Sequence, residues 1–167
     1  MQLMKNSASD RGTQDGADAS TMESASARPK KDTTGRGDVT ELEVALALMR
    51  SGRKVLRPVS TVLRYDLVID DDGNFTRVQC KTGQLRDGSI SFRLCNSDAR
   101  RPLGVPYHGQ VEAFGVHCPE TRRTYLVPLA ELGTMRNLAR LRLTPARNGQ
   151  TKGIRDASRY EIGQAQP

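Results

Sequence analysis

Three polar residues on two neighbouring β-rich runs have the types and spacing that phosphate chemistry requires. Asp66 lies in the first run, and Gln79 and Lys81 lie two residues apart in the second. Asp72-Gly73 between the runs predicts a hairpin with a two-residue loop, because a type I′ turn needs positive φ at both central residues. In that register Asp66 lies opposite Gln79, and Lys81 shares their face. The hairpin therefore predicts a carboxylate, an amide and an ammonium on one small patch.

This patch predicts a divalent metal site. Mg²⁺ is a hard cation that prefers oxygen ligands and keeps several of its waters, so the Asp66 carboxylate, the Gln79 amide oxygen and the backbone carbonyl of Cys80 suit it. Such an ion polarises a phosphoryl oxygen and lowers the pKa of a bound water. The Lys81 ammonium would stabilise charge that develops on the phosphate. The same pattern also fits the wetted face of a half-buried hairpin with no catalytic role.

A helix before the hairpin would supply a second carboxylate. Asp38 and Glu41 have the spacing of a capping box, and the apolar residues that follow recur at helical spacing. Gly52 stands where such a helix would end in a left-handed cap. Glu41 would then lie in the first helical turn, and would reach the metal if the helix packs beside the sheet. The predicted buried stripe is Leu42, Ala45, Leu46 and Met49.

The remaining elements are predicted from short β-rich runs. Strands are expected at 54–57, 62–70, 75–82, 89–95, 111–118 and 124–129, with a short helix over 129–137. Residues 1–36 contain no Val, Ile, Phe, Tyr or Trp, so they cannot bury enough apolar surface to offset their chain entropy. We therefore predict a disordered N-terminal tail over 1–36, one folded domain over 37–163 and a short C-terminal tail over 164–167.

The charge balance favours a polyanionic partner. The chain has 26 Lys and Arg against 19 Asp and Glu, a net charge of +7, although a well-solvated basic surface would give the same count. Arg100 and Arg101, in a proline-flanked loop, and His108 are the candidate DNA contacts. As a bare charge pair, the two arginines equally fit a solvated loop.

Cysteine usage and hydropathy bear on the compartment. Three Cys at these spacings form neither a disulfide framework nor a zinc site, and free thiols fit a reducing, cytoplasmic setting. The sequence shows no apolar run long enough to span a membrane and no secretory leader. We therefore expect a cytoplasmic protein with no membrane partner.

The order of these motifs resembles the PD-(D/E)xK nuclease superfamily. A helix with Glu41 is followed by residues 65–69, a turn, and residues 77–82, which contain the D…QxK pattern. The resemblance is closest to the branch in which Gln replaces the middle acid, the PD-(D/E)xK homing endonucleases of group I introns. Further similar segments are Gly52 with Val55 and Pro58, residues 107–116, 118–121 and 125–128, and residues 141–143 with 148–150.

The resemblance implies a fold and a role for each motif residue. The fold would be α/β (α+β), a restriction-endonuclease-like core with a mixed central β-sheet flanked by helices and an active site at one sheet edge. By position, Glu41 is the helix acid, Asp66 the metal-ligating acid, Gln79 the replacement acid and Lys81 the catalytic lysine. Gln79 removes one negative charge relative to the usual acid and should weaken metal binding.

The leading hypothesis is a Mg²⁺-dependent DNA endonuclease that hydrolyses phosphodiester bonds in double-stranded or branched DNA. One alternative is a nuclease-fold DNA-binding protein that has lost catalysis, and another is a structure-specific nuclease of the Holliday-junction-resolvase kind. A protein-interaction domain with a basic surface is the third class. Because one active site cuts one strand, a homodimer or homotetramer is expected, with DNA recognition by loops or by a symmetric copy.

Overall fold

The computed structural model describes residues 33–96, 104–133, 135, 137–144 and 155–163. The predicted tails lie outside these residues, except that residues 33–36 belong to the first helix and not to a tail. Arg100 and Arg101 also lie outside the described residues. The helix within the described ranges is not apolar enough along its length to cross a membrane.

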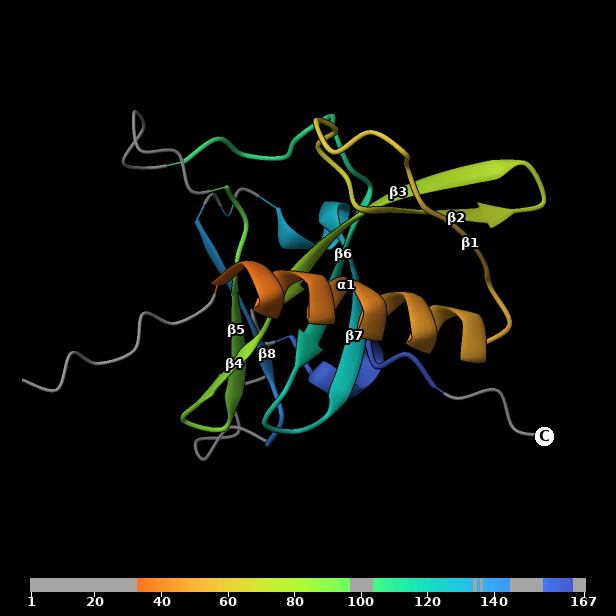
Figure 1. Cartoon of the computed structure of the whole chain (residues 1–167). Coiled ribbons are helices and arrows are strands. Elements are labelled where there is room, and N and C mark those ends of the chain that lie inside the picture. The colour runs from red at the N-terminus through yellow and green to blue at the C-terminus, as the bar shows by residue number, and fades with distance from the viewer. Residues whose placement is uncertain (1–32, 97–103, 134, 136, 145–154, 164–167) are drawn as a thin grey trace, which may run out of the picture. The chain divides into compact units, whose positions relative to one another are not determined.

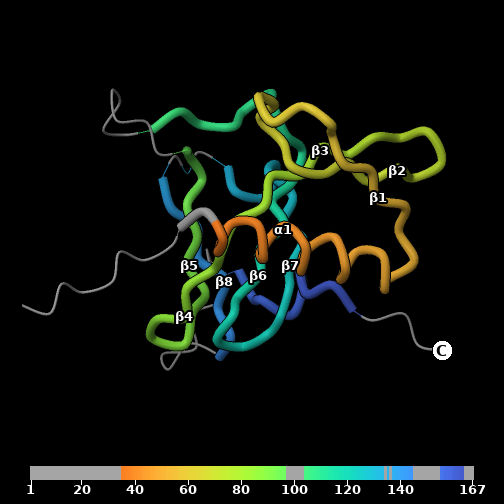
Figure 2. The backbone as a smooth tube through the Cα atoms, in the orientation of Figure 1, coloured from red at the N-terminus to blue at the C-terminus, as the bar shows by residue number. Residues whose placement is uncertain are grey.

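One helix and eight strands make up most of the described chain (Figures 1 and 2). They are α1 (Thr33–Arg50), β1 (Lys54–Leu56), β2 (Leu67–Asp71), β3 (Asn74–Thr82), β4 (Gln84–Arg86), β5 (Ser89–Arg93), β6 (Ala113–Cys118), β7 (Arg123–Pro128) and β8 (Leu138–Arg142). Two 3₁₀ turns, η1 (Leu129–Leu132) and η2 (Ala157–Arg159), complete the list. The helix predicted over 129–137 is therefore only the short η1 turn, and β4 and β8 were not predicted.

The strands form two sheets. The larger sheet is mixed, in the order β1-β2-β3-β6-β7, and its β3–β6 pair is parallel. The smaller sheet has the order β4-β5-β8 and is antiparallel. One apolar core lies between α1 and the large sheet, and a second lies between the two sheets. The predicted mixed α+β class is confirmed, but α1 is the sole α-helix of the described residues, and a sheet covers the other face where flanking helices were expected.

The β2–β3 hairpin has the predicted turn. Asp72 and Gly73 have φ of 50° and 94°, as a type I′ turn requires. Leu67 pairs with Val78 and Asp71 with Asn74, which is the predicted register.

The buried face of α1 differs from the predicted one. The helix begins at Thr33, so Asp38 and Glu41 lie inside it and do not form its N-cap. Its buried residues are Thr40, Val44, Ala45 and Leu48, whereas Leu42, Leu46 and Met49 are 56%, 37% and 53% exposed. Of the predicted stripe, only Ala45 is buried. Two causes lie on the sheet: the Thr40 hydroxyl hydrogen-bonds the Thr82 hydroxyl of β3 at 2.7 Å, and Val44, Ala45 and Leu48 pack into the apolar core of the large sheet.

Gly115 allows this close packing of α1 on the sheet. A Cβ at Gly115 would lie 2.5 Å from Val44 Cγ1 and 3.2 Å from Val78 Cγ1. We expect Gly115→Ala to lower the free energy of unfolding by about 1–3 kcal/mol, because added volume in a packed core forces shifts. Urea unfolding measures this change.

Gly37→Ala is the matched control for that measurement. Gly37 lies within α1, and a Cβ there would meet nothing within 4 Å. This substitution should raise the free energy of unfolding by about 0.5–1 kcal/mol, because alanine loses less backbone entropy in a helix. Equal stability of Gly115→Ala and the wild type would contradict the tight helix–sheet contact.

Candidate active site

The candidate site lies where β2 stops and β3 continues. The β2–β3 ladder ends at the Leu67–Val78 pair, while β3 runs on to Thr82 beside β6. Asp66 directly precedes β2, and its N–H donates to the Val78 carbonyl at 2.9 Å. The regular ladder therefore ends one pair short of Asp66 and Gln79, which leaves the end of β3 open on this side.

The Asp66 carboxylate fills this opening. Its Oδ2 atom accepts the backbone N–H of Cys80 at 2.7 Å and also accepts the side-chain amide of Gln79. Burial raises the pKa of Asp66, while the Cys80 N–H and the positive charge of Lys81 act in the opposite direction. The carboxylate, the amide and the ammonium predicted on one patch are thus brought together.

Glu41 reaches the same site from α1. Burial and then the nearby Asp66 charge raise the pKa of Glu41, whereas Arg57 opposes the shift. Arg57 Nη2 donates to Glu41 Oε2 at 3.2 Å. Arg57 was not predicted as a site residue, since a single cation after a short β-rich run has no distinctive spacing.

Lys81 is held by an aromatic residue that the sequence pattern did not single out. Its Nζ donates to the Tyr107 hydroxyl at 3.0 Å and lies 4.7 Å from the centre of that ring. Tyr107 is 4% exposed and packs edge-on against Phe114. The Arg64 guanidinium lies 4.4 Å from the centre of the Tyr107 ring, and its Nε donates to Gln110 Oε1 at 2.6 Å. Two loops that precede β2 and β6 therefore join beside the lysine.

His108, a predicted DNA contact, is not part of this cluster. His108 follows Tyr107 in the chain, but its side chain is exposed and makes no hydrogen bond or ion pair with the residues that the structure describes. The Cys80 carbonyl oxygen does lie in the site, 3.4 Å from Gln79 Nε2.

Residues 31–163 match the family model described as PD-(D/E)XK endonuclease. The chain belongs to this family. Among solved structures it is similar to a bacterial homing endonuclease, I-Ssp6803I, with a TM-score of 0.62 and 21% sequence identity over 78% of this chain and 88% of that chain. No curated protein sequence matches the chain. The predicted family resemblance is thus confirmed.

The donor atoms in this member of the PD-(D/E)XK endonuclease family fit a Mg²⁺ ion. Among the residues that the structure describes, no group of three or more His, Cys, Asp and Glu side chains could hold a metal ion. Mg²⁺ is nevertheless usually bound through only one or two carboxylates, with waters and substrate phosphates completing the shell. Asp66 and Glu41 are two such carboxylates, and the Gln79 amide and Cys80 carbonyl add neutral oxygens.

The charge balance of the site also favours a cation. The pKa values of Asp66 and Glu41 are both raised, so each carboxyl binds its proton more tightly in the folded chain than in the unfolded one. At neutral pH, where both carboxyls are ionised, the folded protein is therefore less stable than it would be with unshifted pKa values. A divalent cation between the two carboxylates would offset this loss of stability.

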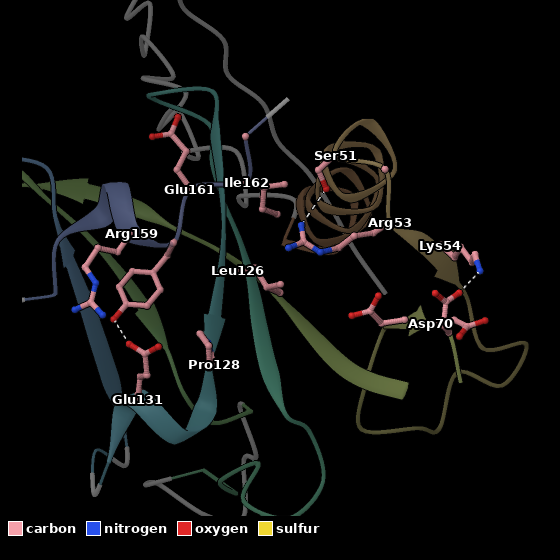
Figure 3. Close-up of a pocket in the computed structure, with 15 residues that line it drawn as sticks. Ser51, Arg53, Lys54, Asp70, Leu126, Pro128, Glu131, Arg159, Glu161 and Ile162 are labelled. Carbon is pink, nitrogen blue, oxygen red and sulfur yellow. Dashed lines mark hydrogen bonds and ion pairs between the residues drawn. The ribbon is translucent and has the colours of Figure 1, made fainter. Parts of the chain in front are cut away.

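A pocket lies apart from the candidate site, and Figure 3 shows the residues that line it. It is an open pocket of about 780 Å³ between the end of α1, the β2–β3 turn, β7 and the η2 segment. Several of its polar groups are already paired, since Lys54 contacts Asp72 at 2.7 Å and the Tyr160 hydroxyl donates to Glu131 at 2.6 Å. None of the four family motif residues lines it.

Tyr107→Phe tests whether the tyrosine hydroxyl positions Lys81. The substitution keeps the ring that packs on Phe114 and removes only the oxygen that accepts from Lys81. We expect the single-turnover cleavage rate to fall about 3- to 10-fold with unchanged DNA affinity, because a misplaced catalytic group slows the chemical step. Tyr160→Phe, another buried tyrosine whose hydroxyl contacts Glu131, should cleave at the wild-type rate. Equal rates for both variants would exclude the positioning role.

Proposed function

We propose that this chain is a Mg²⁺-dependent DNA endonuclease that hydrolyses phosphodiester bonds. The observation that supports it most directly is the convergence of Asp66, Gln79, Lys81 and Glu41 at the open end of β3, in a chain of the PD-(D/E)XK endonuclease family. Each of these residue types has a defined task in phosphate chemistry.

Asp66 and Glu41 would hold the metal ion, with the Gln79 amide oxygen and the Cys80 carbonyl as further donors. When bound, Mg²⁺ polarises the phosphoryl group and makes an attacking water more acidic. The Gln79 amide nitrogen faces Asp66 in this structure, so a half-turn of the amide presents its oxygen instead.

Lys81 would act on the scissile phosphate. Its positive charge stabilises the Asp66 carboxylate, and its ammonium donates to the Tyr107 hydroxyl, which would fix its position. A fixed cation next to the phosphate stabilises the negative charge that develops during attack without reorganisation at the moment of reaction. Arg57 donates to the Glu41 carboxylate at 3.2 Å and would restrict its movement.

The proposed substrate is double-stranded or branched DNA, and the net charge of +7 supports a polyanionic partner. Because one site cuts one strand, we propose that two or more copies act together on a duplex. A cytoplasmic location belongs to the same proposal, since the three cysteines are free and buried.

A second candidate function is DNA binding without cleavage. Gln79 favours it, because an amide in place of a carboxylate gives the metal one negative charge fewer. Salt-sensitive DNA binding with no cleavage in Mg²⁺ or Mn²⁺ would select this candidate.

The deciding experiment is plasmid nicking by the wild type and by Asp66→Ala, each in Mg²⁺ and in EDTA. We expect nicking only by the wild type in Mg²⁺, and restoration of nicking when Mg²⁺ in excess of EDTA is added back. Asp71→Ala, an exposed acid at the hairpin end, should behave as the wild type. Nicking that survives EDTA or the loss of the Asp66 carboxylate would refute the proposed mechanism.

A further inference from the structure

The outer face of the small sheet is rich in arginine. Strand alternation directs Ile90, Phe92, Ala139 and Leu141 into the core, where each is at most 2% exposed. Leu85, which pairs with Ile90, shares that inward face, and the side chains at the alternate positions of the three strands face outward. Cross-strand pairing arranges them in three rows: Arg86, Ser89 and Arg142, then Gln84, Ser91 and Arg140, then Arg93 and Leu138.

This surface, here called the arginine face, is defined by Arg86, Arg93, Arg140 and Arg142. None of the four forms an ion pair with a residue that the structure describes. Arg142 donates to the Thr144 carbonyl at 3.1 Å, and the other three make no hydrogen bond within the described chain. The outward positions of the three strands include no Asp or Glu, since Asp87 lies in the β4–β5 turn. Four guanidinium groups without a carboxylate partner among the described residues therefore lie on the outer side of one sheet.

We propose that the arginine face docks in the major groove of B-form duplex DNA. This inference rests on the proposed function and identifies the surface that would contact the bases of the substrate. β5 and β8, which carry Arg93, Arg140 and Arg142, are neighbouring strands about 5 Å apart, and the major groove, about 12 Å wide, admits a two-stranded β-ribbon. Arginine recognises guanine through O6 and N7, glutamine recognises adenine, and an apolar side chain contacts the thymine methyl. Arg93, Gln84 and Leu138 are the matching exposed types. Duplex RNA does not fit, because its major groove is deep and narrow.

The position of the face relative to Lys81 supports this assignment. β3 passes into β4 through Gly83 alone, so Gln84 lies three residues beyond Lys81, about 10 Å along an extended chain. The joint is tightly held, since a Cβ at Gly83 would lie 2.6 Å from Ile90 Cγ2 and the Gly83 N–H donates to the His117 carbonyl at 2.7 Å. Bases read by the face would therefore begin about 3 base pairs from the scissile phosphate, at about 3.4 Å per pair.

This assignment places recognition on the nuclease domain itself. The sequence analysis predicted recognition by loops or by a second copy, whereas this inference assigns it to a sheet that directly continues the β3 strand.

Fluorescence anisotropy with the full chain in metal-free buffer tests the proposal. The face variant is Arg86→Ala/Arg93→Ala/Arg140→Ala. The control variant, Arg50→Ala/Arg53→Ala/Arg159→Ala, removes the same charge from exposed positions on α1, the turn after it and η2. The probes are a short DNA duplex of mixed sequence, the same duplex methylated at guanine N7, and a duplex RNA of that sequence.

We expect the face variant to bind the DNA duplex about 10- to 100-fold more weakly, with a salt slope lower by about 2–3, and the control variant to lose less than about 3-fold. Guanine N7 methylation should weaken binding by the wild type and have no further effect on the face variant. Equal losses in both variants, or equal binding of duplex RNA, would overturn the arginine face.

Cleavage in Mg²⁺ separates this inference from the proposed function. If the wild type binds DNA through the arginine face but does not cleave it, the proposed nuclease function is wrong and the proposed role of the arginine face stands. If the wild type cleaves DNA and the face variant binds and cleaves DNA equally well, the proposed role of the arginine face is wrong and the nuclease function stands.

Discussion

Lys81→Met should lower the single-turnover cleavage rate by about 10²- to 10³-fold, the usual loss when one preorganised group that stabilises the transition state is removed. The Lys81 ammonium lowers the pKa of the Asp66 carboxyl by its positive charge and donates to the Tyr107 hydroxyl at 3.0 Å. Methionine keeps an unbranched apolar side chain of nearly the same length and removes the ammonium, with both its charge and its hydrogen bond to Tyr107. DNA affinity should therefore stay within about 3-fold of wild type, because most phosphate contacts lie elsewhere.

Lys54→Met is the control for this measurement. Lys54 is also a strand lysine next to an aspartate, since it contacts Asp72 at 2.7 Å, but it is exposed and lies at the far end of the hairpin. Its loss should leave the cleavage rate unchanged, because exposed ion pairs contribute little. A Lys81→Met protein that cuts at the wild-type rate would show that the ammonium is not part of the chemistry.

Gln79→Glu should increase Mg²⁺ affinity at least about 10-fold, because affinity for a hard cation rises with the number of charged ligands. The same change should destabilise the metal-free protein by about 1–2 kcal/mol, since it removes the amide that donates to Asp66 and adds a third carboxylate. Asp66 and Glu41 already have raised pKa values in this site. Thermal unfolding against Mg²⁺ concentration measures both effects, because a ligand stabilises the folded state in proportion to ln(1 + [L]/Kd).

Gln84→Glu adds the same charge on exposed β4, outside the metal site, and should change neither quantity. If Gln79→Glu showed the Mg²⁺ dependence of the wild type, Gln79 would not face the metal. The role of Gln79 as replacement acid would then be wrong.

The hairpin was predictable because its determinants are local. Asp72 and Gly73 set the turn type, and alternation then fixes which side chains share a face. Asp87 and Gly88, in the turn between β4 and β5, also have positive φ values, 48° and 67°. The partner strand β8, however, lies far along the chain from β5, and no local pattern encodes that pairing.

The helix face was mispredicted because hydrophobicity is only one reason for burial. Thr40 is 2% exposed because its hydroxyl has a partner on β3, and Val44 is buried because Gly115 leaves space for it. Both causes lie on other strands. The contacts of Tyr107 and Arg64 likewise depend on two loops meeting in space, so no spacing in the sequence revealed them.

The burial of Cys80 shields β3 from oxidation. Its side chain faces the core, is 7% exposed, and has a pKa that burial raises well above the usual value of a thiol. Peroxides and alkylating reagents attack the thiolate and need access to the sulfur. We therefore expect the folded protein to resist these reagents at Cys80, so that the candidate site would keep its geometry under conditions that inactivate enzymes with exposed cysteines.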